Sequence, residues 1–125
     1  MADNLYIATT NGVFTARRES EGWHKVEGSL SAHFVTSVAA CEGFILVGTK
    51  DGIWRSVDGG RNWNLASKGL DLPWPQHMVE RFCQSNEELI AVLSNGELWS
   101  TELEAIEWHH ILPDIEGITS IAVSR

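Results

Sequence analysis

The residues with the most evident chemical potential are two histidines and a charged pair, Glu80-Arg81. His77 follows His33 by 44 residues, each histidine precedes an apolar segment by two residues, and Glu116 stands at the third equivalent position. Imidazole and carboxylate are suitable ligands for a borderline divalent metal. Such ligands must lie within about 2.0–2.2 Å of the ion. Residues from separate repeats that surround a wide opening do not converge so closely. We therefore expect solvated loop residues, no metal site and no cofactor.

A second candidate is Trp74, which stands between Pro73 and Pro75 in a loop between repeats. The two prolines stiffen the loop and present the aromatic ring. If exposed, the ring could stack on a sugar, a base or a peptide; the alternative is a plug that packs over the channel. Glu80 and Arg81 replace small polar residues of the other repeats, and they form either an internal ion pair or a polar anchor for a small ligand. Together with His33 and His77, these three are the candidate ligand-binding residues.

The stretch 56–63 reads S-V-D-G-G-R-N-W. It resembles the Asp-box hairpin, S-x-D-x-G-x-T-W, of sialidase-like β-propellers, and departs from it only at Asn62. The resemblance implies that Ser56 and Asp58 satisfy backbone groups of the turn, that Gly60 allows a positive φ, and that Trp63 packs between blades. It implies structural roles for these four residues. The catalytic set of sialidases has no counterpart at any position of this sequence, so we expect no catalytic residues by that route.

The chain repeats itself around this stretch. A shift of 40 places 5–9 on 45–49 and Trp23 on Trp63, and a shift of 44 places Val35 on Val79. Asn-Gly or Asp-Gly turns recur between paired apolar runs, which is a strong hairpin signal. Each unit reads as four short strands, which is typical of a propeller blade. The sequence therefore predicts an all-β fold of three blade equivalents.

The expected order of these strands is permuted. Blade 2 covers 35–66 and blade 3 covers 79–112, whereas blade 1 has only its last three strands within 5–26. The segment 118–123 has the pattern of a first strand, because it matches 35–40. We expect it to complete blade 1 of a second copy, which gives a single 1–125 half that closes as a six-bladed homodimer by strand exchange. Nine blades from three chains, a fragment of a longer propeller, or a heteromer with a related chain are the alternatives.

Composition excludes several classes of protein. The net charge of -8 argues against a nucleic-acid partner, since phosphate binding needs clustered Lys and Arg. No apolar run approaches the length of a membrane span, and the first residues lack the features of a signal peptide. Cys41 and Cys83 fit neither a zinc spacing nor a C-x-x-C motif, so we expect buried thiols and a cytoplasmic location.

Two functions follow as hypotheses. The first is a non-catalytic binding or assembly scaffold that recognises a small molecule, glycan or protein partner on the face that carries the loops between blades. The alternative is a carbohydrate-active hydrolase with a site in the channel of the dimer, built around Glu80 and Arg81. Such repeats are similar to those of photosystem assembly factors as well as carbohydrate-active enzymes, so fold alone does not choose between the two.

Overall fold

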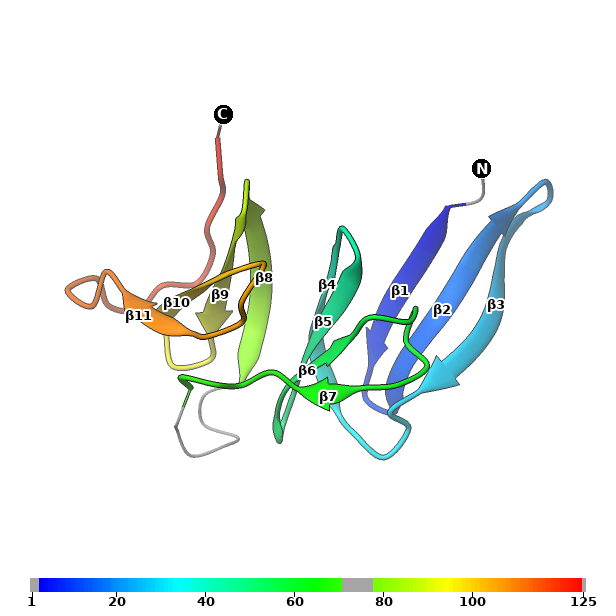
Figure 1. Ribbon diagram of the computed structural model, residues 1–125, viewed down its shortest axis with the longest axis horizontal. Coiled ribbons are helices and arrows are strands. Elements are labelled where there is room, and N and C mark those ends of the chain that lie inside the picture. The colour runs from blue at the N-terminus through cyan, green and yellow to red at the C-terminus, as the bar shows by residue number, and fades with distance from the viewer. Residues whose placement is uncertain (1–2, 71–77, 125) are drawn as a thin grey trace.

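The computed structural model describes residues 3–70 and 78–124. These residues form three antiparallel sheets that stand side by side (Figure 1). The prediction of an all-β fold is confirmed. In the described part of the chain, no helix has the length and apolar character needed to cross a bilayer.

The first sheet has three strands, β1 (Asn4–Thr9), β2 (Gly12–Glu19) and β3 (Gly22–Ser29), in that order. A side chain closes the β1–β2 turn: the Thr9 hydroxyl donates to the Gly12 carbonyl at 2.9 Å and accepts from the Asn11 amide at 3.0 Å. Gly12 has a φ of 106°, which glycine adopts readily. β3 is twice as long as the expected strand at 23–26.

The second sheet has four strands in sequence order, β4 (Val35–Cys41), β5 (Phe44–Thr49), β6 (Gly52–Ser56) and β7 (Asn64–Leu65). Its β5–β6 turn repeats the bonds of the first sheet, since the hydroxyl of Thr49 donates to the carbonyl of Gly52 and accepts from the amide of Asp51. β7 is only two residues long, because the tight turn at 56–63 occupies the chain just before it.

The third sheet also has four strands: β8 (Val79–Ser85), β9 (Glu88–Leu93), β10 (Leu98–Glu102) and β11 (His109–Ile111). β8 and β4 share one irregularity. The register with the second strand shifts between Val79 and Arg81 in β8, and between Val35 and Ser37 in β4. The two four-stranded sheets therefore repeat each other in register as well as in order.

The segment 118–123, expected to form a strand on a second copy, is assigned to no strand in the single chain, and Val123 is exposed. The prediction of a strand on a second copy stays a prediction. The segment is attached near its start, where the Ile118 amide lies 3.3 Å from the Gly96 carbonyl. A strand needs a neighbour that offers free backbone groups, and the edge that the repeat assigns to this segment belongs to β1, in the sheet at the other end of the row (Figure 1).

Two apolar clusters lie between the sheets. Between the first and second sheets, Ile45 and Val47 pack with Val13. Between the second and third, a larger cluster brings Leu46 of β5 and Leu89 of β9 together, with Trp108 at 1% exposure. β5 is buried along its whole length because it has a sheet on either side. Burial between sheets is thus the main stabilising contact of the molecule.

The tryptophans that recur by unit join each sheet to the one before it. The Trp63 indole N–H donates to the Ser29 hydroxyl at 3.1 Å, and the Trp108 indole N–H donates to the Ala66 carbonyl at 2.8 Å. Trp23, in the first sheet, is 46% exposed. The first sheet has no preceding sheet among the described residues, which accounts for this exposure.

Candidate functional site

The turn that carries the 56–63 motif is held by two side chains. The Ser56 hydroxyl donates to Asp58 Oδ1 at 2.8 Å and accepts from the Gly60 amide at 2.8 Å. Asp58 Oδ1 also accepts from the amides of Arg61 and Asn62, at 3.1 and 2.9 Å. Gly60 has a φ of 93°, as the turn requires. These bonds are internal to the turn, so the serine and the aspartate are used in shaping it.

Asn62 accommodates the departure from the usual motif. Its side-chain amide donates to Asp58 Oδ2 at 2.7 Å, as a threonine hydroxyl could do from the same position. Hydrogen bonds lower the pKa of Asp58 to about 2. The bond from the Asn62 backbone amide lowers it most, followed by the bonds from the Asn62 side chain and the Ser56 hydroxyl. The carboxylate is therefore ionised across the ordinary pH range.

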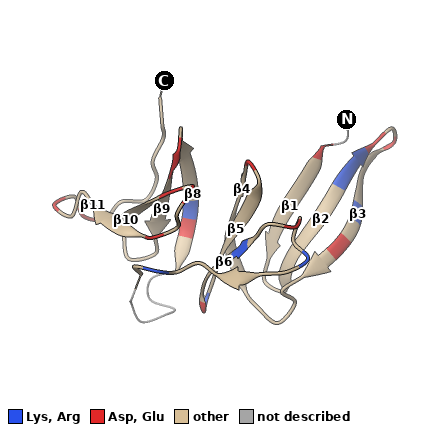
Figure 2. Cartoon of the chain, in the orientation of Figure 1, with Lys and Arg blue, Asp and Glu red and all other residues tan. Residues whose placement is uncertain are grey.

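The first strands of the second and third sheets meet the C-terminal segment at a cavity of about 320 Å³. β4 contributes Ser37, β8 contributes Glu80 and Arg81, and the C-terminal segment contributes Ser120. Figure 2 shows the acidic and the basic residue side by side on β8. The Ser37 hydroxyl is buried and has no hydrogen-bond partner among the described residues. Glu80 and Arg81 are both exposed, so neither charge is buried in the single chain.

His33 lies at the opposite end from the 56–63 turn, next to the β5–β6 turn. Its Nδ1 is 3.3 Å from Asp51 Oδ2, a distance that favours an ion pair when the ring is protonated, although the atoms are not aligned for a hydrogen bond. The imidazole also packs against Trp54, with ring centroids 5.3 Å apart. Beside it, Lys50 Nζ lies 4.5 Å from the ring centroid of Phe34, within the range of a cation–π contact. We call these five residues the β5–β6 patch.

The β5–β6 patch was not anticipated beyond His33. Phe34 is 39% exposed, and Lys50 and Asp51 are exposed charges of opposite sign. Trp54 Nε1 is buried and has no hydrogen-bond partner in the described part of the chain. The sequence signal for this patch is the Lys-Asp-Gly turn, which predicts a hairpin but not the aromatic residues beside it.

The remaining candidates of the sequence do not join this patch. Trp74 and His77 lie outside the described residues. Glu116 is exposed in the segment after β11. Within 3–70 and 78–124, no three metal-ligating side chains come together. His33 is thus brought to Asp51 and Trp54, and it does not line the cavity that contains Glu80 and Arg81.

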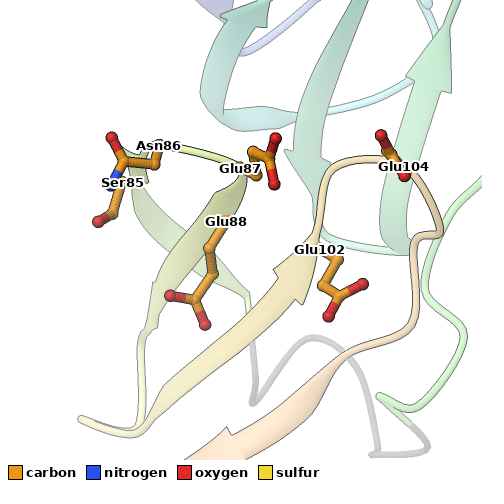
Figure 3. A pocket seen from close by; sticks show the side chains of 6 residues that line it. All are labelled: Ser85, Asn86, Glu87, Glu88, Glu102 and Glu104. Atoms are coloured by element: carbon orange, nitrogen blue, oxygen red, sulfur yellow. The ribbon is translucent and has the colours of Figure 1, made fainter.

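A second cavity, of about 390 Å³, lies at the end of the third sheet and is lined by acidic side chains (Figure 3). Glu87 comes from the β8–β9 turn and Glu88 from the start of β9, whereas Glu102 and Glu104 come from the end of β10 and the loop after it. Glu88 and Glu102 are direct partners in the antiparallel register. Like charges in this position repel each other, and nothing in the cavity identifies a ligand.

The two cysteines are free thiols on first strands, Cys41 at the end of β4 and Cys83 within β8. They were expected to be buried, but both are half-buried. Cys41 lies at the margin of the cluster between the second and third sheets, and Cys83 lines the cavity that contains Glu80 and Arg81. Burial still raises the pKa of the Cys41 thiol.

The chain is similar in structure to a solved protein. A structure of YCF48 bound to a D1 peptide superimposes with a TM-score of 0.65 and 14% sequence identity, over 92% of this chain and 39% of the YCF48 chain. This chain therefore spans well under half of that neighbour. No protein-family model matches the sequence, and no curated protein matches it. At this identity the likeness concerns the fold, and the three sheets have the arrangement of β-propeller blades.

Proposed function

We propose that the chain is a non-catalytic β-propeller scaffold that binds a segment of another protein. The turn at 56–63 supports a relationship with Asp-box propellers in particular, because its serine and aspartate bond to the turn in the way that motif requires. We infer a ring of six blades, made by two copies of the chain, since three blades are too few for a ring and natural propellers have four to eight.

The observation that carries the proposal is the β5–β6 patch. It combines an exposed aromatic ring, Phe34, with a cation and a carboxylate on the adjoining turn, Lys50 and Asp51. Protein interfaces are enriched in aromatic residues, and their polar groups set orientation. Among residues 3–70 and 78–124, the buried nitrogens His33 Nδ1 and Trp54 Nε1 have no hydrogen-bond partner, which marks a place where a ligand could complete the cluster. A bound backbone carbonyl could supply an acceptor after a small movement of the imidazole.

The structural neighbour supports the choice of a peptide. YCF48 is described in complex with a D1 peptide, and we take a peptide as the class of ligand for the present chain as well. The net charge of -8 in the present chain favours a segment that carries basic side chains. We infer an extended segment with at least one basic and one apolar residue, which Asp51 and Phe34 would contact respectively.

A peptide display library screened against the whole chain tests this function. We expect enrichment of peptides with a basic and an apolar residue. Binding should fall at least tenfold for Asp51→Ala and for Phe34→Ala. Glu21→Ala, an exposed acidic residue at the opposite end of the first sheet, is the matched control and should bind as the unmodified chain does. Failure to enrich any peptide, or equal binding by all variants, would overturn the proposal.

The hydrolase is a second candidate, favoured by the cavity that contains Glu80 and Arg81. Glycoside hydrolysis needs two carboxyl groups about 5–10 Å apart, and a two-fold ring would bring the Glu80 side chains of both copies to one channel. A panel of glycoside substrates decides the matter. Turnover that disappears in Glu80→Gln would favour the hydrolase over the scaffold, and absence of turnover on every substrate would remove it.

A further inference from the structure

The inner edge of the first sheet lacks the strand that completes the other two sheets. In the second and third sheets, β4 and β8 pair with β5 and β9. β1 is the counterpart of β5 and β9, and no described strand pairs with its edge away from β2. Leu5 and Ile7 of β1 are 44% and 39% exposed, whereas their equivalents Ile45 and Val47 of β5 are 4% and 0% exposed. Ile45 and Val47 are covered by the preceding sheet, so Leu5 and Ile7 mark an uncovered face of the first sheet. The unpaired edge of β1 beside this face is a template for strand addition.

The segment 118–124 has the sequence of a first strand but no neighbouring strand to pair with in the described part of the chain. It repeats the sequence pattern of β4, with Ile118 on Val35 and Ile121 on Val38, yet it is in no strand. It lies beside the third sheet and lines the channel cavity through Ser120 and Ile121. The second sheet separates it from β1 of its own chain (Figure 1). It can therefore pair with a β1 edge only in another molecule.

We propose that β1 is the docking site for residues 118–124 of a second copy of this chain, which add there as the missing first strand. This inference rests on the proposed six-bladed ring and specifies its closing contact. The exchange is reciprocal, because in the described part of each copy β1 has an unpaired edge and 118–124 belongs to no strand. A reciprocal contact is the isologous interface of a two-fold dimer, and main-chain pairing of this kind is a known mode of recognition.

The complete sheets fix the register of the exchange. Both contain the same shift near the start of the first strand: Val35 pairs with Thr49 and Ser37 with Gly48, and Val79 pairs with Leu93 and Arg81 with Val92. Applied to the open edge, this pattern gives one set of partners. The expected pairs are Ile118 with Thr9, Ser120 with Ala8, Ile121 with Ile7, Ala122 with Tyr6, and Val123 with Leu5.

One backbone bond extends this register beyond the strand. The Lys50 amide donates to the Phe34 carbonyl at 3.2 Å, and the Ser94 amide donates to the Met78 carbonyl at 2.7 Å. The corresponding bond at the exchanged strand would join the Thr10 amide to the carbonyl of residue 117 in the second copy. This bond occurs in both complete sheets, so we expect the added strand to begin after residue 117.

Trp23 supports the same occupant independently of the strand edge. The equivalent tryptophans of the second and third sheets, Trp63 and Trp108, donate their indole N–H to the sheet before them. The side chain of Trp23 is 46% exposed, with Arg18 stacked at 5.7 Å from the ring centroid. By analogy with Trp63 and Trp108, Trp23 should pack against a preceding sheet and donate its indole N–H to it. The third sheet of a second copy provides one, with its own apolar residues Leu112 and Ile115 exposed.

Cysteine cross-linking tests the register in the full chain. With Cys41 and Cys83 changed to alanine, the double variant Leu5→Cys with Val123→Cys should form a covalent dimer quantitatively on mild oxidation. The matched control, Leu5→Cys with Ala122→Cys, shifts the second cysteine to the other face of the strand and should form at least tenfold less dimer. An intramolecular disulfide in the first variant, or equal yields from the two, overturns the proposal.

Light scattering on the unmodified chain gives the second measurement. Twice the mass of one chain is expected at all practical concentrations, since the contact both pairs a strand and buries apolar faces. The mass of one chain, or of three chains, overturns the two-fold exchange. The peptide screen reads out a different surface, so loss of peptide binding with an intact cross-link removes the proposed function alone, and the converse removes the exchange alone.

Discussion

The hydroxyl of Thr36 lies 2.6 Å from the carbonyl oxygen of Val79, and this hydrogen bond joins the first strand of the second sheet to the first strand of the third. The Thr36 hydroxyl oxygen also lies 3.2 Å from the carbonyl oxygen of Gly48 in its own sheet. A single side chain thus connects the second sheet to the third.

Replacing Thr36 with valine keeps the shape of the side chain and removes this bond. Because it removes a hydrogen bond between two sheets, we expect a loss of about 1–3 kcal/mol in the free energy of unfolding. Chemical denaturation monitored by tryptophan fluorescence measures the loss. Thr10→Val, at an exposed turn residue, is the control and should change stability by less than about 0.5 kcal/mol. Equal effects of the two substitutions would contradict the role given to the bond between sheets.

Gly48 is required because the third sheet and β4 approach β5 at this residue. A methyl group on Gly48 would lie 2.6 Å from the Ser37 hydroxyl and 2.9 Å from Cβ of Val79. We expect Gly48→Ala to destabilise the fold by about 1–3 kcal/mol through overpacking.

The double variant separates the two clashes at this position. The Ser37 hydroxyl has no partner among the described residues, so Ser37→Ala alone should be close to neutral. Combined with Gly48→Ala it should restore part of the lost stability, because one of the two close contacts disappears. Strict additivity of the two changes in a double-mutant cycle would show that Ser37 and Gly48 do not interact.

The carboxylate of Asp58 makes the stability of its turn depend on pH. Its pKa is lowered to about 2 in the folded chain, below its value in an unfolded chain, so the ionised form stabilises the fold. That contribution is complete above about pH 4 and disappears as the pH falls through about 2. The melting temperature of Asp58→Ala should therefore lie several degrees below that of the unmodified chain at pH 7, and the difference should shrink at low pH.

Asp58→Asn distinguishes charge from hydrogen bonding at this turn. The amide oxygen of asparagine can accept the bonds from the Arg61 and Asn62 amides, but its NH₂ group cannot accept from the Asn62 side chain. We expect an intermediate melting temperature at pH 7. A melting temperature of Asp58→Ala that stays offset by the same amount from pH 7 to pH 2 would contradict the assignment.

Glu88 and Glu102 place two carboxylates directly opposite each other on β9 and β10. Glu88→Lys converts this repulsion into attraction and should stabilise the chain by about 0.2–1 kcal/mol at low salt. The gain should fall at high salt, because exposed charges are screened. Glu21→Lys, at a turn of the first sheet, is the control for the change in net charge. An equal gain in the control would assign the effect to net charge instead of the cross-strand pair.

The sequence by itself determined the features that depend on neighbouring residues. The turns at Asn11-Gly12 and Asp51-Gly52 and the bonds of Ser56 and Asp58 involve residues within four positions of each other. The alternation of apolar and polar residues and the repeat length predict the strands of the three sheets, because alternate residues of a strand lie on opposite faces. These local signals were enough for the fold class.

Tertiary structure decided what depends on residues far apart in the chain. His33 meets Asp51 and Trp54, and the carboxylates of Glu87 and Glu104 share a cavity, because separate turns come to the same end of a sheet. The strand expected at 118–123 shows the limit most directly. Its sequence has the pattern of β4, but a strand forms only when a second backbone offers free donors and acceptors, and in the single chain that backbone is out of reach.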